Sequence, residues 1–89
     1  MIKTTTTISN KLGLHARASA KLTKLAGSYP CEVWVSRGER RVNGKSIMGV
    51  MMLAAGMGTE VTLETDGDRE EQAMEALLAL IDDKFGEGE

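Results

Sequence analysis

Short stretches of strand-like and helix-like periodicity alternate along the whole chain, and this alternation constrains the fold more than any other feature. Apolar or β-branched residues recur at every second position in three segments, which predicts strands at 2–9, 31–36 and 61–65. The turn at Arg37-Gly38 predicts that residues 39–43 return as a further strand. Apolar residues at helical spacing predict helices at 16–26, 47–53 and 68–85. The element order is therefore β-α-β-β-α-β-α.

This order favours an α+β fold, a two-layer open-faced sandwich in which a four-stranded antiparallel sheet carries three helices on one face. The chain has 89 residues, enough for one thin hydrophobic core, so residues 1–89 are expected to form a single domain. A domain of this size has no room for a deep internal active site, and its chemistry should lie at the surface.

The last helix has the clearest sequence pattern. Asp68 and Glu71 have the spacing of a capping box, which predicts the helix start. One apolar stripe then runs along the helix and consists of Met74, Leu77, Leu78, Ile81 and Phe85. The final residues, 86–89, read Gly-Glu-Gly-Glu and are expected to be a frayed tail.

Composition excludes several kinds of protein. The longest apolar stretch, 47–55, is far shorter than the ~20 residues that a membrane span needs, so no membrane insertion is expected. With one cysteine, Cys31, and one histidine, the chain offers neither an internal disulfide nor a metal-ligand cluster. We therefore expect no metal, no cofactor and a cytoplasmic location, with Cys31 serving as a small buried hydrophobe.

Charge is distributed unevenly along the sequence. Residues 1–45 hold nine Lys or Arg and two acidic residues, whereas residues 46–89 hold two and eleven. The pI of about 5.4 and the scarcity of aromatic residues argue against nucleic-acid binding. The basic half is either an ordinary solvated surface or a face that attracts an acidic partner or a phosphate.

His15 lies after a glycine-containing loop and directly before the helix predicted at 16–26, which makes it the expected N-cap or its neighbour. The first amides of that helix, at Ala16, Arg17 and Ala18, lack intrahelical acceptors and can bind an anion. The guanidinium of Arg17 suits phosphate oxygens. A lone histidine is usually an unremarkable surface residue, but imidazole, amides and arginine together are what a phosphohistidine requires.

Two segments resemble a known family. Gly13-Leu14-His15-Ala16-Arg17 looks like the active-site motif of HPr, the histidine-containing phosphocarrier of the bacterial phosphoenolpyruvate-dependent sugar phosphotransferase system. Residues 43–51, Asn-Gly-Lys-Ser-Ile-Met-Gly-Val-Met, resemble the regulatory-serine region of that family. The resemblance implies that phosphorylated enzyme I phosphorylates His15 on Nδ1. It also implies onward transfer to the A components of sugar-specific enzymes II and a sheet order of 1-4-2-3.

One residue departs from the family motif. After the arginine the family usually has proline, whereas this chain has Ala18. Proline in the first helical turn presets the φ angle and has no amide hydrogen. Ala18 therefore gives up rigidity and adds an amide donor beside His15. We expect the site to survive the change, because the anion-binding amides are those of Ala16 and Arg17.

The predicted helix at 47–53 is apolar nearly all round, so one side of it must face water in a two-layer domain. Its methionines either fill an irregular core or form an adaptable contact patch, and we favour the patch. By resemblance, this helix lies beside His15 and docks on partners together with helix 16–26. The expected partner-binding residues are Ile47, Met48, Met51, Lys21 and Lys24.

Ser46 precedes the same helix. Its position predicts an N-cap, and the resemblance adds a role as a regulatory phosphorylation site for a serine kinase or phosphorylase. A phosphate there would place about two negative charges at the edge of the methionine patch.

The leading interpretation is a monomeric covalent phosphocarrier, loaded by an enzyme and not itself an autonomous enzyme. An alternative within the family is a carrier of the nitrogen-regulatory branch of the same relay. An alternative from another class is an α+β regulatory or ligand-binding domain without phosphorylation, which would leave the pairing of His15 with Arg17 unexplained.

Overall fold

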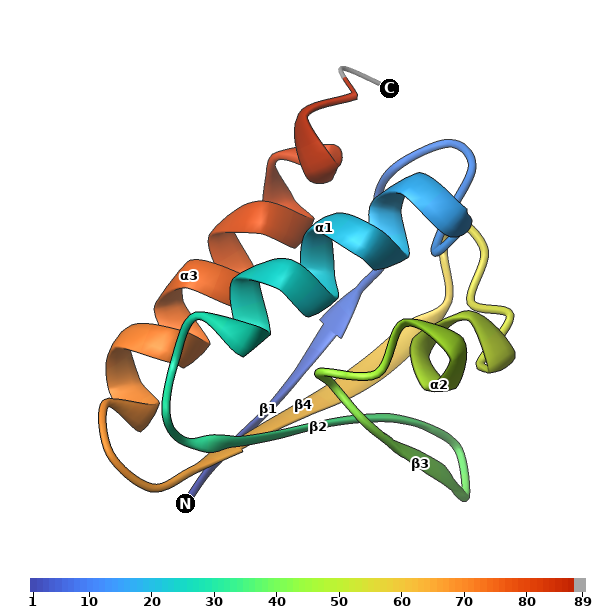
Figure 1. The fold of residues 1–89 in the computed structure, drawn as a ribbon. Helices are drawn as coiled ribbons and strands as arrows, with labels where there is room; N and C mark the ends of the chain where they lie inside the picture. Colours follow the sequence, from blue (N-terminus) through green and yellow to red (C-terminus); the bar gives the residue numbers. More distant parts are fainter. Residues whose placement is uncertain (88–89) are drawn as a thin grey trace.

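The structure is a computed structural model that describes residues 1–87 (Figure 1). Four strands and three helices alternate along the chain, and a single 3₁₀ turn, η1, follows the last helix. Their bounds are β1 (Ile2–Thr7), α1 (Ala16–Gly27), β2 (Glu32–Arg37), β3 (Arg40–Asn43), α2 (Ile47–Met52), β4 (Glu60–Asp66), α3 (Glu70–Asp82) and η1 (Lys84–Gly86). The predicted order of elements is confirmed.

The four strands form one antiparallel sheet in the order β1-β4-β2-β3. β4 lies between β1 and β2. Leu63 of β4 is opposite Thr4 of β1 on one side and opposite Val35 of β2 on the other. All three helices lie on the same face of the sheet (Figure 1). The open-faced sandwich and the sheet order are both confirmed.

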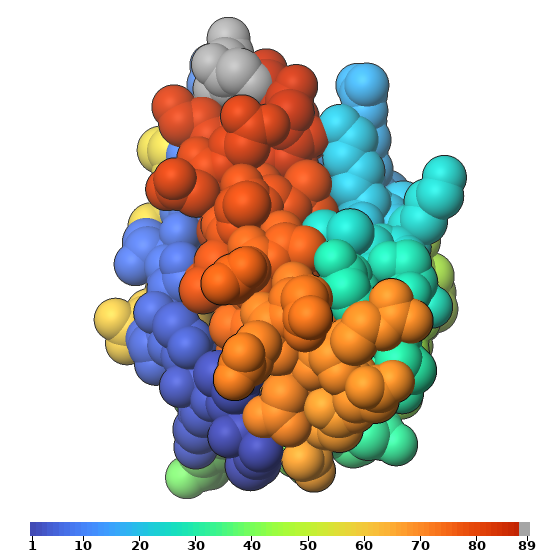
Figure 2. Space-filling model, turned by 90° about the vertical axis from the view of Figure 1, so that its left-hand side faces the viewer, coloured from blue at the N-terminus to red at the C-terminus, as the bar shows by residue number. Residues whose placement is uncertain are grey.

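The core lies between the sheet and the helices. Alternate residues of β2 and β4 point inward because side chains of a strand alternate between its two faces. The buried ones are Val33, Val35, Val61 and Leu63. Helix α3 covers one flank of this core, and Figure 2 shows it between β1 and α1. The predicted stripe of α3 is buried at Met74, Leu77 and Ile81, while Leu78 is half-buried.

The start of α3 corrects the capping-box prediction. The N-cap is Arg69, in the left-handed region at φ +61°, and neither Asp68 nor Glu71 caps the helix. Instead, Oε1 of Glu70 accepts a hydrogen bond from the amide of Gly67. The ammonium of Met1 lies 2.9 Å from Oε2 of Glu70 and, together with that amide, lowers the pKa of this carboxyl. The helix therefore begins one residue later than the capping box predicted, and the Glu70 carboxylate is held by a neighbouring amide and by the N-terminus of the chain.

The end of α3 also differs from the prediction. The helix stops at Asp82, not near Phe85, because Lys84 and Phe85 take positive φ angles of 55° and 56°. The reversed backbone still buries Phe85 completely, as the apolar stripe predicted. It also turns Glu87 back toward the body of the molecule, so the expected frayed tail is wrong for residues 86–87. Residues 88–89 lie outside the described part of the chain.

Within residues 1–87, every helix is too short or too polar to traverse a bilayer.

Candidate functional site

The loop before α1 is held in one conformation by its backbone. Gly13 has φ +67°, and a Cβ there would lie 2.5 Å from the carbonyl oxygen of Ala55 and 2.6 Å from Cα of Gly56. Only glycine fits this close approach. The next amide, that of Leu14, donates to the same Ala55 carbonyl at 2.8 Å. The loop is therefore fixed against the segment after α2 immediately before His15.

His15 is the N-cap of α1, as predicted. Its backbone is extended, at φ −74° and ψ −179°, and its carbonyl accepts from the amide of Ser19 at 2.8 Å. The ring performs the capping, because Nδ1 accepts a hydrogen bond from the amide of Ala18 at 3.0 Å. The side chain is 26% exposed, so the ring is held in place and remains accessible.

The amides of Ala16 and Arg17 remain available. Both residues are exposed, and neither amide has an acceptor within residues 1–87. The first turn of α1 contains no acidic residue that would offset the positive end of the helix dipole, although the carboxylate of Glu87 lies beside its N-cap, His15. The amide of Ala18 differs from these two, because it already donates to Nδ1 of the His15 ring in this structure.

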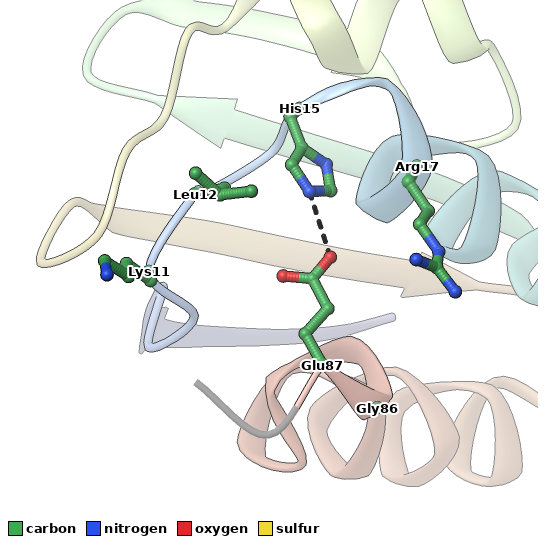
Figure 3. A pocket seen from close by; sticks show the side chains of 6 residues that line it. All are labelled: Lys11, Leu12, His15, Arg17, Gly86 and Glu87. Atoms are coloured by element: carbon green, nitrogen blue, oxygen red, sulfur yellow. Dashed lines mark ion pairs between the residues drawn. The ribbon is translucent and has the colours of Figure 1, made fainter.

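A shallow pocket surrounds the ring (Figure 3). It is lined by residues from the loop before α1, the first turn of α1 and the segment after α3, namely Lys11, Leu12, His15, Arg17, Gly86 and Glu87. In Figure 3 the side chains of His15 and Glu87 point toward each other, and Arg17 projects from α1 beside them. Segments from the two ends of the chain thus build one site.

Glu87 and Asn10 are the residues that sequence reasoning missed. Oε2 of Glu87 lies 3.0 Å from Nε2 of His15 but makes no hydrogen bond of favourable angle within residues 1–87. Oε1 accepts from Nδ2 of Asn10 at 3.0 Å, and the same Nδ2 donates to the carbonyl of Gly13 at 2.8 Å. A fully buried asparagine therefore anchors a carboxylate beside the imidazole.

One sequence signal could have indicated the position of Glu87. Phe85 continues the apolar stripe of α3, so the chain is anchored in the core only two residues before Glu87. A tail anchored that close to its carboxylate cannot be freely frayed. For Asn10 there is no such local signal, because its partners come from contacts made by the folded chain.

The second predicted region lies on α2. Oγ of Ser46 accepts from the amide of Gly49 at 3.1 Å, which confirms Ser46 as the N-cap. Val50 is the buried residue of this helix. Its outer side exposes four large apolar side chains, Ile47, Met48, Met51 and Met52, of which Met48 is the most exposed at 66%. We refer to these four residues as the methionine patch.

The two lysines expected to bind partners differ in their surroundings. Lys24 is exposed near the end of α1, whereas Lys21 is half-buried and its Nζ donates to the carbonyl of Phe85. Lys21 therefore also holds η1 against α1. Residues 1–87 contain no group of three or more side chains arranged to hold a metal ion. Cys31 is buried and unpaired, as expected.

Comparison with known sequences gives a consistent picture. Residues 2–83 match the family model described as the PTS HPr component phosphorylation site. The chain is 67% identical over its whole length to the phosphocarrier protein HPr of Cupriavidus necator, which it covers completely. It is 44% identical over 81 residues to the phosphocarrier protein NPr of Shewanella violacea, covering 91% of this chain and 89% of the relative.

Comparison with solved structures agrees. The crystal structure of HPr-C-His from Thermoanaerobacter tengcongensis superposes with a TM-score of 0.95 at 45% identity and covers 98% of each chain. A second structure, described as an HPr dimer from the same organism, gives a TM-score of 0.79 at 45% identity, over 98% of this chain and all of the other. Similar chains thus include one crystallised as a dimer.

Proposed function

Since the chain belongs to the HPr family of phosphocarriers of the phosphotransferase system, we propose that His15 accepts a phosphoryl group on Nδ1 from phosphorylated enzyme I and passes it to the A components of sugar-specific enzymes II. In this proposal the protein is an intermediate carrier without catalytic turnover of its own. It works in the cytoplasm as a monomer, in contrast to the similar chain described as a dimer.

One observation carries this proposal. His15 caps α1 in a surface pocket, beside two amides that have no acceptor among residues 1–87 and beside the guanidinium of Arg17. A phosphoryl group on this ring would meet hydrogen-bond donors and the positive end of a helix, which together favour a bound dianion. The position is also open enough for a second protein to reach it.

The transfer is a substitution at phosphorus. The lone pair of Nδ1 forms the new bond to phosphorus, while the bond to the donor breaks and its electron pair stays with the donor. The amides of Ala16 and Arg17 and the guanidinium of Arg17 stabilise the phosphoryl oxygens throughout. Discharge to an enzyme II component reverses these roles, with Nδ1 as the leaving atom.

The methionine patch is proposed to dock enzyme I and the enzyme II components. The support is chemical, because flexible apolar side chains exposed on one helix can adapt to several partners. Ile47, Met48 and Met51 would form the apolar contact. Lys24, and Lys21 where it remains accessible, would add positive charge that attracts acidic groups of the partner.

Regulation at Ser46 is a further part of the proposal. Ser46 is half-buried at the start of α2, next to the methionine patch. A serine kinase would add a phosphate where the helix dipole tolerates it, and a phosphorylase would remove it. The phosphate would oppose docking of an acidic partner on the adjacent patch.

The nitrogen-regulatory branch is the alternative assignment within the family. The higher identity to the relative called HPr, 67% against 44% for the relative called NPr, favours the sugar branch. Comparing the loading rates by the enzyme I of each branch would distinguish the two, since the proposal expects faster loading by the sugar-branch enzyme.

The test of phosphorylation is incubation with phosphoenolpyruvate and enzyme I, followed by intact-mass measurement. The wild-type chain should gain one phosphoryl group, and His15→Ala should gain none while keeping its fold. Loss of the capping ring should cost about 1 kcal/mol of stability, because His15 is the N-cap of α1. The adduct should be lost in acid and stable in base, as a phosphoramidate is. Undiminished labelling of the variant, or a base-labile adduct, would rule out His15.

A further inference from the structure

The two ring nitrogens of His15 face different neighbours, and these neighbours determine which nitrogen carries the proton of the neutral ring. Nδ1 accepts from the amide of Ala18 at 3.0 Å, so its single in-plane lone pair is occupied and carries no proton. The proton of the neutral ring therefore lies on Nε2, which is 3.0 Å from Oε2 of Glu87. Both contacts favour the same tautomer, the one in which Nδ1 is the nucleophilic nitrogen.

The hydrogen bond from the Ala18 amide also occupies the Nδ1 lone pair that must attack phosphorus in phosphoryl transfer. Nδ1 cannot form a bond to phosphorus along the direction in which it accepts a hydrogen bond, so loading must break this contact. The amide of Ala18 is then left in the first turn of α1, in a part of the helix where amides have no intrahelical acceptor. A phosphoryl oxygen bound through Nδ1 is an acceptor that the reaction itself brings to this amide.

We propose that the backbone N–H of Ala18 is a positioning group for phosphoryl transfer, which holds Nδ1 of His15 unprotonated in the unloaded carrier and donates to a phosphoryl oxygen in the loaded one. This inference rests on the proposed function of His15. The exchange replaces a hydrogen bond to a neutral nitrogen by one to an anionic oxygen, which is the stronger of the two.

The atoms and electron pairs balance when the Ala18 hydrogen bond is exchanged for the bond to phosphorus, and no further reactant is needed. The Nδ1 lone pair passes from the Ala18 hydrogen to phosphorus, and the electron pair of the broken bond stays with the donor. The Nε2 proton remains on the ring, so the ring is cationic at that moment and lies against the Glu87 carboxylate. Glu87 is held there by the buried Asn10, so the carboxylate is already in place before loading.

Loss of this amide can be tested without removing the ring. Ala18→Pro deletes the N–H at a position in the first turn of the helix, where proline is tolerated. Ala18→Gly is the matched control, because it removes only a methyl group and keeps the amide. The Ala18→Pro phosphohistidine should hydrolyse about tenfold faster than that of Ala18→Gly, the factor expected when one charge-assisted hydrogen bond is lost.

The unmodified chain gives a second readout that does not depend on either variant folding. In protein labelled with ¹⁵N, the unloaded carrier should show through-hydrogen-bond coupling between the Ala18 nitrogen and Nδ1 of His15. After loading with phosphoenolpyruvate and enzyme I, the coupling should vanish while the Ala18 amide stays protected from hydrogen exchange.

Equal phosphohistidine lifetimes in the two variants would overturn the proposal, as would absence of the coupling in the unloaded carrier or loss of amide protection after loading. If His15 is not phosphorylated at all, the proposed function fails. The coupling in the unloaded carrier then still decides whether Ala18 holds the ring.

Discussion

In the proposed function, the amides of Ala16 and Arg17, which have no acceptor within residues 1–87, and the guanidinium of Arg17 present positive charge to the phosphoryl group at Nδ1 of His15. The ring is fixed through Ala18 on one nitrogen and faces Glu87 with the other. In the proposed function these contacts, and not the partner protein, select Nδ1 as the reacting nitrogen. The charged residues that line the pocket with His15 are Lys11, Arg17 and Glu87, and Arg17 is the one in the first turn of α1.

Arg17→Glu should slow loading by roughly 10- to 100-fold, because a charge-assisted hydrogen bond is lost and a negative charge is placed beside the phosphoryl oxygens. The melting temperature should hardly change, since the side chain is exposed. Stopped incubation with phosphoenolpyruvate and enzyme I, read by intact mass, gives the rate. Lys3→Glu on the exposed side of β1 is the control for the same change in net charge, and a loading rate of Arg17→Glu equal to that control would show that the amides alone suffice.

At the scale of secondary structure, helix α2 exposes apolar side chains next to its N-cap, Ser46. One residue, Val50, ties this short helix to the core, and its outer side consists of the methionine patch. Because so little of the helix is buried, the exposed side chains can be changed with little effect on folding. The structure thus allows the docking and the regulatory proposals to be tested separately from stability.

Met48→Glu should weaken binding to enzyme I by about 1–3 kcal/mol, the range for a charged substitution at an apolar contact, without unfolding the domain. Met48 is exposed, so a thermal melt should match the wild type. Titration calorimetry measures the affinity, with Thr5→Glu on the open face of the sheet as the charge-matched control. A melt shifted downward by many degrees would place Met48 in the core and contradict the docking role.

Ser46→Asp should reduce the loading rate while the melting temperature holds. Aspartate is as good an N-cap as serine, and its charge is favourable at a helix start, so α2 should persist. The same charge opposes an acidic partner at the neighbouring methionine patch. Ser46→Asn, a neutral cap of similar size, is the control. Loading of Ser46→Asp at the rate of Ser46→Asn would rule out the switch, and a collapsed melt would mean that the cap had failed.

Across the whole molecule, the site is assembled from segments that lie far apart in sequence. Local patterns predicted much of it, because an N-cap depends on its own helix, and both His15 and Ser46 cap the helices that follow them. Alternating hydrophobicity likewise predicted the strands and the helix stripes. The sheet order followed from the family resemblance.

What the sequence could not predict depends on contacts between distant segments. Glu87 reaches His15 only because Phe85 turns the chain back through a left-handed conformation, and Asn10 holds the carboxylate only in the folded chain. The capping box at Asp68 failed for a local reason, because the N-cap is Arg69 in the left-handed region. The ion pair between the ammonium of Met1 and Glu70 at the start of α3, however, again joins residues far apart in sequence. Motifs of three or four residues do not contain these partners.

The central claim, that Nδ1 of His15 carries the phosphoryl group, is tested most directly by nitrogen NMR of the loaded protein. The chain has a single histidine, so labelling histidine with ¹⁵N marks one ring. After loading, the Nδ1 signal should be split by coupling to ³¹P and the Nε2 signal should not. Splitting of the Nε2 signal, or an intact mass that shows phosphorylation while both ring signals remain unsplit, would contradict the claim.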